Sequence, residues 1–152
     1  LVGSEMCIRD SFSAVPGREL WSGANDTLRE KIGEDYPRDT FRHEQDLLVT
    51  ENGKTALFAG CAHCGIVNIL KSAEDVLGRA PDAVFAGFHL YNPSLGKSEP
   101  DELVDAVGEK LRGDKVAHYF TGHCTGKEAY ERLKRKLGDR LGEMPAGSDF
   151  TV

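Results

Sequence analysis

Apolar positions along this chain alternate between short runs with strand character and longer runs with helical spacing. The runs at 46–50 and 54–59 flank an Asn-Gly pair at 52–53, which is typical of a tight β-hairpin turn. After Gly65, apolar residues recur every three or four positions, which predicts a helix ending near Gly78. Further predicted elements are a buried strand at 83–86, a helix at 98–112 capped by Ser98, a strand at 116–120, a helix opened by a capping box of Thr125 and Glu128, and a terminal strand at 149–152.

The predicted order of elements is β-β-α-β-α-β-α-β, which indicates an α/β (α+β) fold. Strands that are joined through helices lie parallel, so right-handed crossovers bring their carboxyl ends to one edge of the sheet. Residues 12–45 are rich in Gly, Pro, Asp and Arg and contain few periodic apolar positions. We therefore expect an irregular, lid-like segment before the first hairpin.

Each of the strands predicted within 54–120 is followed closely by a glycine and a histidine. These histidines are His63, His89 and His123. Because the strand ends are expected to converge, the imidazoles should converge as well. Neutral imidazole is the commonest protein metal ligand, and a neighbouring glycine lets the backbone approach a site closely. The pattern therefore predicts a metal site at the edge of the sheet, with these histidines as ligands.

The amino-terminal residues 1–11 show neither strand alternation nor helical spacing. Translated back into codons, they resemble an adapter that is used to prepare DNA sequencing libraries. We interpret them as a non-native scar and exclude them from the fold prediction. On this interpretation the natural gene was cut at this point, and the chain is a carboxyl-terminal fragment.

Composition and charge restrict the classes of function. Charged residues make up 29% and hydrophobic residues 39% of the 152 residues, which is ordinary for a globular domain. No apolar run approaches the roughly 20 residues of a membrane span. The net charge of −6 argues against binding to a nucleic-acid backbone, which requires a basic surface. We expect a soluble protein that acts on a small molecule, without a nucleic-acid or membrane partner.

Beyond the first ten residues the chain contains Cys61, Cys64 and Cys124. An odd number of cysteines beside candidate ligands, with no visible secretory signal, favours a reducing cytoplasm over a disulfide framework. The cysteines also permit a rival hypothesis, a non-catalytic structural zinc site or redox module built on all of them. Against it, the chain has a single C-x-x-C pair. Buried packing is the simpler role for Cys64 and Cys124.

Several ordered motifs give the sequence a specific resemblance. They are GCAHCGIVNIL at 60–70, AGFHL at 86–90 and TGHCTG at 121–126, preceded by EQDLLV at 44–49. In this order they resemble the second half of a metallo-β-lactamase-fold hydrolase, in the branch related to the dihydropterin ribofuranosyl-aminobenzene phosphate synthases. The resemblance covers roughly residues 38–150.

The resemblance implies an αββα sandwich that binds one or two divalent metal ions at the sheet edge, with zinc expected and manganese or iron as alternatives. It assigns residues 46–152 to the carboxyl-terminal half of that domain. The family's H-x-H-x-D-H motif, which supplies the first ligands, is absent from this sequence. We therefore expect the isolated chain to bind metal weakly, to catalyse little or nothing, and to expose apolar surface.

Position by position, the resemblance makes His63 a ligand of the first metal and His123 a ligand of the second. His89 falls where many relatives have a bridging aspartate, so both direct ligation and a hydrogen-bonding role behind the ligands stay open. Tyr91 and Asn92 are candidates for a substrate-binding loop. The implied reaction is hydrolysis of an ester or phosphoester by a metal-activated water. The sequence identifies no catalytic proton acceptor.

Overall fold

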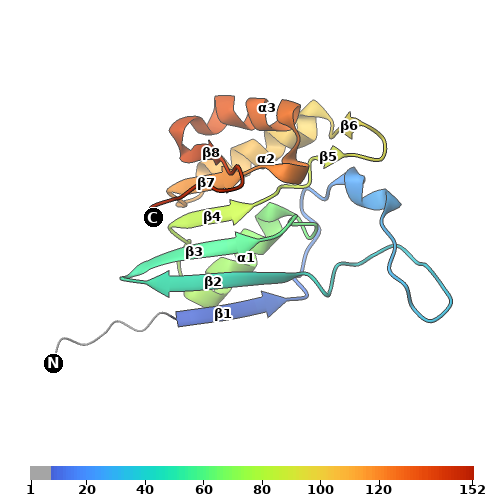
Figure 1. Cartoon of the computed structure of the whole chain (residues 1–152), viewed down its shortest axis with the longest axis horizontal. Coiled ribbons are helices and arrows are strands. Elements are labelled where there is room, and N and C mark those ends of the chain that lie inside the picture. Colours follow the sequence, from blue (N-terminus) through green and yellow to red (C-terminus); the bar gives the residue numbers. More distant parts are fainter. Residues whose placement is uncertain (1–7) are drawn as a thin grey trace.

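The computed structural model describes residues 8–152, and its centre is a mixed sheet with the strand order β1-β2-β3-β4-β7-β8 (Figure 1). The strands are β1 (Ile8–Ser13), β2 (Gln45–Glu51), β3 (Lys54–Ala59), β4 (Ala83–Ala86), β7 (His118–Thr121) and β8 (Leu141–Glu143). Pairing is antiparallel from β1 to β3 and parallel from β3 to β8. The strand order and the helical connections confirm the predicted α/β class.

Helices connect the parallel strands, and shorter elements lie between them. The helices are α1 (Ile66–Leu77), α2 (Asp101–Gly113) and α3 (Lys127–Leu137). The short elements are the hairpin of β5 (Tyr91–Asn92) and β6 (Lys97–Ser98) and the 3-10 turns η1 (Gly23–Thr27), η2 (His123–Thr125) and η3 (Gly138–Arg140). Within residues 8–152, none of the helices combines the length and the apolar character that crossing a bilayer requires.

The hairpin of β2 and β3 forms where the Asn-Gly pair predicted it. Glu51 pairs with Lys54, and the turn residues Asn52 and Gly53 both have positive φ, at 51° and 76°. This is the backbone that a two-residue turn needs to match the twist of the strands. Helix α1 also ends as predicted, since Gly78 adopts the left-handed conformation that closes a helix.

One row of side chains across the sheet forms the centre of the core. The paired residues Leu48, Leu57, Val84, Tyr119 and Leu141 are all at most 2% exposed. Successive crossovers run in the same direction across the sheet, so the helices cover this face together. The buried faces of α1, α2 and α3 complete the core.

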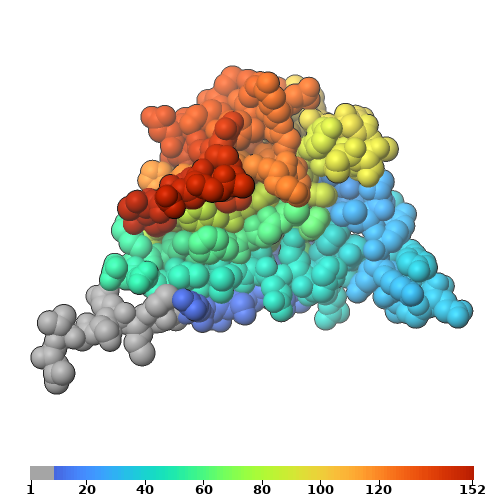
Figure 2. Space-filling view, viewed as in Figure 1, coloured from blue at the N-terminus to red at the C-terminus, as the bar shows by residue number. Residues whose placement is uncertain are grey.

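The next row of paired residues lies on the opposite face of the sheet and is largely aromatic. It contains Leu47, Phe58, Phe85 and Phe120. Leu47 and Phe58 are 38% and 41% exposed, while the ring of Phe150 covers Phe85 and Phe120 at centroid distances of 5.4 and 4.4 Å. Figure 2 shows the carboxyl-terminal segment, in red, lying across this face. An apolar surface is therefore left open over β2 and β3.

Both ends of the sheet correct the sequence prediction. No strand is predicted at residues 8–13, yet β1 pairs along β2 from Ile8 opposite Thr50 to Ser13 opposite Gln45. Because pairing uses the backbone, a segment without alternating side chains can occupy a free edge. The origin of residues 1–11 as an adapter scar stays a prediction, and residues 1–7 lie outside the described part of the chain.

The predicted terminal strand at 149–152 is wrong. The edge beside β7 is filled by β8, where Leu141 pairs with Tyr119 and is completely buried. This strand has only three residues, with Gly142 at its centre, and so gives little signal in the sequence. Phe150 instead packs on the outer face of the sheet.

The predicted caps of α2 and α3 are also wrong. Helix α3 begins after Gly126 and α2 after Pro100, and neither helix has a side-chain cap. The hydroxyl of Thr125 accepts the backbone N–H of Phe88 at 2.9 Å and lies 2.6 Å from the hydroxyl of Thr121. These tertiary bonds connect the ends of β4 and β7. They occupy the Thr125 hydroxyl, which a capping box would use to cap α3.

Asp46 is a buried carboxyl group on the helix-covered side of β2. It is completely buried, and neither of its oxygens has a hydrogen-bond partner among residues 8–152. Burial and, secondarily, the charge of Glu44 raise the pKa of Asp46 to about 7. Ionisation of Asp46 therefore opposes folding.

We predict that Asp46→Asn stabilises the chain more at about pH 8 than at about pH 5. The raised pKa of Asp46 means that protonation favours the fold as pH falls through about 7, and that this stability is lost as pH rises. The gain at the higher pH should exceed the gain at the lower pH by about 2 kcal/mol, measured by urea unfolding. Asp10→Asn on the exposed edge strand is the control. Equal gains at both pH values would contradict the prediction.

Candidate metal centre

The carboxyl ends of β3, β4 and β7 lie side by side at one edge of the sheet (Figure 1). Gly87, directly after β4, is in close contact with the loops that follow β3 and β7. A methyl group on Gly87 would lie 2.6 Å from Sγ of Cys124 and 3.5 Å from Cα of Cys61. The loops after the three strands therefore meet, as parallel connections require.

His63 and His89 are brought into contact at this edge. Their ring centroids lie 4.4 Å apart, with the edge of one ring toward the face of the other. The ring of Phe41, from the irregular segment, stacks on His63 at 4.7 Å and an interplanar angle of 6°. Stacking by Phe41 and contact with His89 restrict the plane of the His63 imidazole.

The imidazole of His89 is buried without a polar partner. The residue is 7% exposed, and neither ring nitrogen has a hydrogen-bond partner within the described part of the chain. Burial first, and then the nearby His63, lower the pKa of His89 to about 4, against the opposing charge of Glu44. His89 is therefore neutral at physiological pH, and an imidazole nitrogen with a free lone pair is a metal donor.

Glu44 orients His63 from the amino-terminal side of β2. One carboxylate oxygen accepts the backbone N–H of His63 at 2.8 Å and lies 3.0 Å from Nδ1 of the same residue. The other oxygen accepts the backbone N–H of Cys64 at 2.9 Å. A carboxylate at Nδ1 places the ring proton there and leaves the lone pair on Nε2, which is the arrangement around many metal-bound histidines.

The charge state of Glu44 follows from these contacts. Burial by itself would raise the pKa of Glu44, but the hydrogen bonds from the His63 side chain and from the backbone of Cys64 and His63 lower it below its ordinary value. Glu44 is thus ionised at neutral pH and remains an acceptor for the loop after β3.

The irregular segment also holds the backbone of both histidines. Ser22 donates its hydroxyl to the carbonyl of His89 at 2.7 Å, and Asn25 donates its amide to the carbonyl of His63 at 2.9 Å. The amide of Asn68 donates to the carbonyl of Cys64 at 2.9 Å, which fixes the loop from the side of α1. The segment before β2 is therefore part of the centre.

Left-handed backbone conformations gather at the candidate centre. Ala62, His89 and His123 have φ values of 53°, 47° and 52°. This conformation costs free energy in a residue other than glycine and persists where the surrounding structure enforces it. Such strain is concentrated at sites where side chains must be aimed at a common point.

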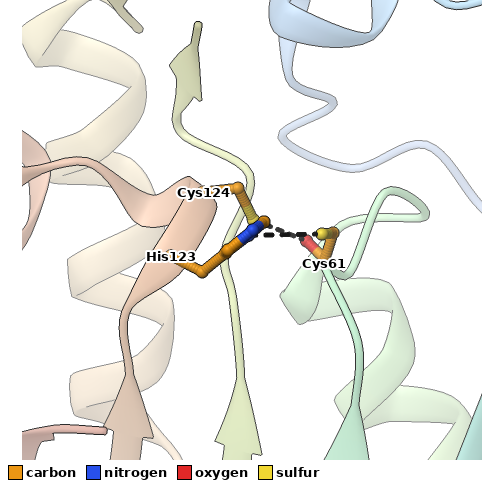
Figure 3. Close-up of side chains that lie close together, drawn as sticks. All are labelled: Cys61, His123 and Cys124. Atoms are coloured by element: carbon orange, nitrogen blue, oxygen red, sulfur yellow. Dashed lines mark hydrogen bonds between the residues drawn. The ribbon is translucent and has the colours of Figure 1, made fainter. Parts of the chain in front are cut away.

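His123 lies beside two cysteines at the same edge. Its Nδ1 atom is 3.7 Å from Sγ of Cys61, and the thiol of Cys124 donates to the carbonyl of Cys61 at 3.6 Å. Figure 3 shows the three side chains pointing toward one another from the loops after β3 and β7. Their candidate donor atoms all lie within 4.8 Å of one another.

Cys64 stands apart from this cluster. Its thiol is 1% exposed and donates to the carbonyl of Phe41 at 3.6 Å. Burial first, and then the charge of Glu44, raise the pKa of Cys64 to about 12, so the thiol stays protonated. Cys64 therefore has a packing role. This differs from the hypothesis of a site built on Cys61, Cys64 and Cys124, in which Cys64 would be a ligand. These three cysteines are free thiols.

The candidates for substrate binding lie in different surroundings. The Asn92 side chain is buried, and its oxygen accepts the backbone N–H of Ser94 at 3.0 Å while its amide faces the carbonyl of Ala24 at 3.4 Å. Tyr91 is half-buried, and a methyl group on Gly126 would lie 2.6 Å from its Cβ. Contact of either side chain with a substrate stays a prediction.

Sequence reasoning missed Glu44, Ser22 and Asn25 as parts of the centre. Glu44 lies in the EQDLLV motif, so its place just before β2 was a usable signal. Ser22 and Asn25 act through bonds to main-chain carbonyls at sequence distances of 67 and 38 residues. No local pattern reports such bonds.

Comparison with known proteins gives a relative in sequence and a neighbour in fold. No protein-family model matches the chain. It is 30% identical over 101 residues to the 7,8-dihydropterin-6-methyl-4-(β-D-ribofuranosyl)-aminobenzene-5'-phosphate synthase of Methanocaldococcus jannaschii. The match covers 66% of this chain and 32% of the relative, so the chain spans about a third of the relative's length.

A solved structure gives the wider match. The crystal structure of Tm1679, a metal-dependent hydrolase of the β-lactamase superfamily, aligns with 100% of this chain at a TM-score of 0.73 and 20% sequence identity. The alignment covers 57% of that structure. Over the length that it shares with Tm1679, the chain therefore has the same fold as that protein.

Proposed function

We propose that this chain is part of a metal-dependent hydrolase in which a metal-activated water attacks an ester or phosphoester bond of a small molecule. The observation that carries the proposal is the contact between His63 and His89 at the sheet edge. One of these imidazoles is oriented by a partly buried carboxylate, and both nitrogens of the other lack a partner among residues 8–152.

The residues at this edge fit a divalent cation. With Nδ1 of His63 facing Glu44, the donor to a metal is Nε2 of His63, and His89 is held neutral with a free lone pair. His123 is the third candidate from the adjacent loop. Imidazole donors suit zinc or iron, whereas manganese, the other alternative, prefers oxygen ligands. We propose one or two such ions.

The chain's own residues orient these donors. Glu44 fixes the tautomer of His63, while Ser22 and Asn25 hold the carbonyls of His89 and His63. Phe41 covers one face of the His63 ring. A bound cation would lower the pKa of its water from about 15.7 toward about 7 and polarise the substrate oxygen.

We propose that the substrate lies in the cleft beside His123. This cleft has a volume of about 270 Å³, and Lys127, Tyr130 and Glu143 are among the residues that line it. The cation of Lys127 favours an anionic group, in agreement with a phosphoester. Gly126 is a lining residue that also borders Tyr91, so Tyr91 can approach a molecule bound there.

We further propose that the isolated chain binds metal weakly and hydrolyses little. A metal centre with tight binding normally has three or four protein ligands with supporting groups behind them. The chain spans only part of the length of both proteins that it matches.

We also propose a cytoplasmic location, because the free thiols agree with a reducing compartment.

The proposed ligands can be tested by calorimetric titration of the purified chain with Zn²⁺. We predict that His63→Ala and His89→Ala each weaken zinc binding by about tenfold or more, because each removes a donor. His118→Ala is the matched control, since His118 is an exposed histidine at the start of β7 and should leave binding unchanged. Equal effects of all three variants would refute the assignment.

The role of Glu44 predicts a separate outcome. Glu44→Gln keeps the size of the side chain but removes the charge that orients His63, so zinc affinity should fall by about 10- to 100-fold. Glu51→Gln, an exposed residue at the other end of β2, is the control. NMR of the His63 ring nitrogens should show the Nδ1–H tautomer in the parent chain and a mixture in the variant. An unchanged tautomer with unchanged affinity would contradict this role.

A further inference from the structure

We propose that Cys61, Cys124 and His123 form a second metal position, which takes one thiophilic divalent cation such as zinc, cobalt or cadmium. It goes beyond the proposed hydrolase centre and shares only His123 with it. It does not rest on that centre, because the two thiols contribute nothing to the contact of His63 with His89. The position lies at the same sheet edge, between the loops after β3 and β7 (Figure 3).

The spacing of the donor atoms is close to that of a tetrahedral site. Bonds of about 2.3 Å to sulfur and about 2.0 Å to nitrogen place neighbouring ligands roughly 3.5–3.8 Å apart. Nδ1 of His123 lies 3.7 Å from Sγ of Cys61, and all donor atoms of the set lie within 4.8 Å of one another. Small rotations of the thiols would bring them to a common ion.

The surrounding structure holds the set in place. Cys124 is 8% exposed, and its sulfur packs so closely against Gly87 that a methyl group there would lie 2.6 Å away. Its thiol donates to the carbonyl of Cys61, which ties the two loops together. His123 has a positive φ of 52°, which is a strained conformation, and its imidazole lies beside Cys61.

The donor chemistry selects the class of cation. Two sulfur donors and an imidazole suit zinc and its softer analogues, whereas magnesium, calcium and manganese prefer oxygen ligands. Three protein ligands leave the fourth tetrahedral position free for water or another ligand. On binding, each thiol loses its proton to solvent and donates a lone pair to the ion, so no oxidant or reductant is needed.

The test is a titration of the full chain with Co²⁺ under reducing conditions. All variants carry Cys7→Ser, so that only the three thiols of residues 8–152 can bind cobalt. We expect a thiolate-to-cobalt charge-transfer band in this parent chain, and loss of the band in Cys61→Ser and in Cys124→Ser. Cys64→Ser, in which the buried thiol beside Phe41 is changed, is the matched control and should keep the band. A band that survives both Cys61→Ser and Cys124→Ser would overturn the proposal.

Two further measurements guard against variants that fail to fold. Gly87→Ala keeps both thiols but displaces the Cys124 sulfur, so it should weaken the band. In the parent chain itself, one equivalent of Zn²⁺ should protect Cys61 from alkylation, as read by peptide mass spectrometry. If Zn²⁺ does not protect Cys61 from alkylation, the site is refuted, and this result requires only the parent chain.

The outcome is separable from that of the hydrolase centre. His63→Ala and His89→Ala should leave the cobalt band intact, because they remove imidazoles outside the thiol cluster. If these variants leave zinc binding unchanged and the cobalt band persists, the proposed hydrolase centre is refuted and the second metal position is supported. Loss of the band in His63→Ala, with the fold intact by circular dichroism, would overturn the separate position.

Discussion

The parallel alignment of β3, β4 and β7 is the constraint on which the rest of the structure depends. It brings three loops, each with a histidine, to one edge of the sheet. The alignment is maintained by the fully buried row that includes Leu57, Val84 and Tyr119. A shift of one residue between these strands would turn the row outward and separate the histidines. Core packing and site geometry are therefore set by the same register.

The edge of the sheet carries polar groups that the fold accommodates at a cost. The imidazole of His89 is buried without a partner among residues 8–152, and three residues of the loops adopt left-handed conformations. Each feature is unfavourable for folding by itself. Bonds from Glu44, Ser22 and Asn25 hold the backbone of His63 and His89, and none of these three residues lies in the loops that carry the histidines. Functional sites typically retain such locally unfavourable features, because they hold side chains in the orientation that the site needs.

The two clusters at this edge differ in chemistry. His63 and His89 offer nitrogen donors supported by a carboxylate, whereas Cys61 and Cys124 offer sulfur beside the imidazole of His123. His123 stands at the boundary of the two clusters, with its Nδ1 atom on the side of Cys61. The same edge of the sheet therefore presents a borderline donor set, the imidazoles of His63 and His89, and a softer set with the thiols of Cys61 and Cys124. The difference allows metals of different softness to distinguish the clusters.

Local sequence determined the parts of this protein whose signals are local. Asn52 and Gly53 set the hairpin, Gly78 ends α1, and repeated strand ends indicated where the histidines gather. Only the tertiary structure decided the positions of β1 and β8, the bonds of Thr125 and the part played by Glu44. These depend on a free strand edge or on a partner many residues away, because backbone pairing and buried hydrogen bonds are satisfied by whichever group folding brings near. The residue types could be read in advance, but their partners could not.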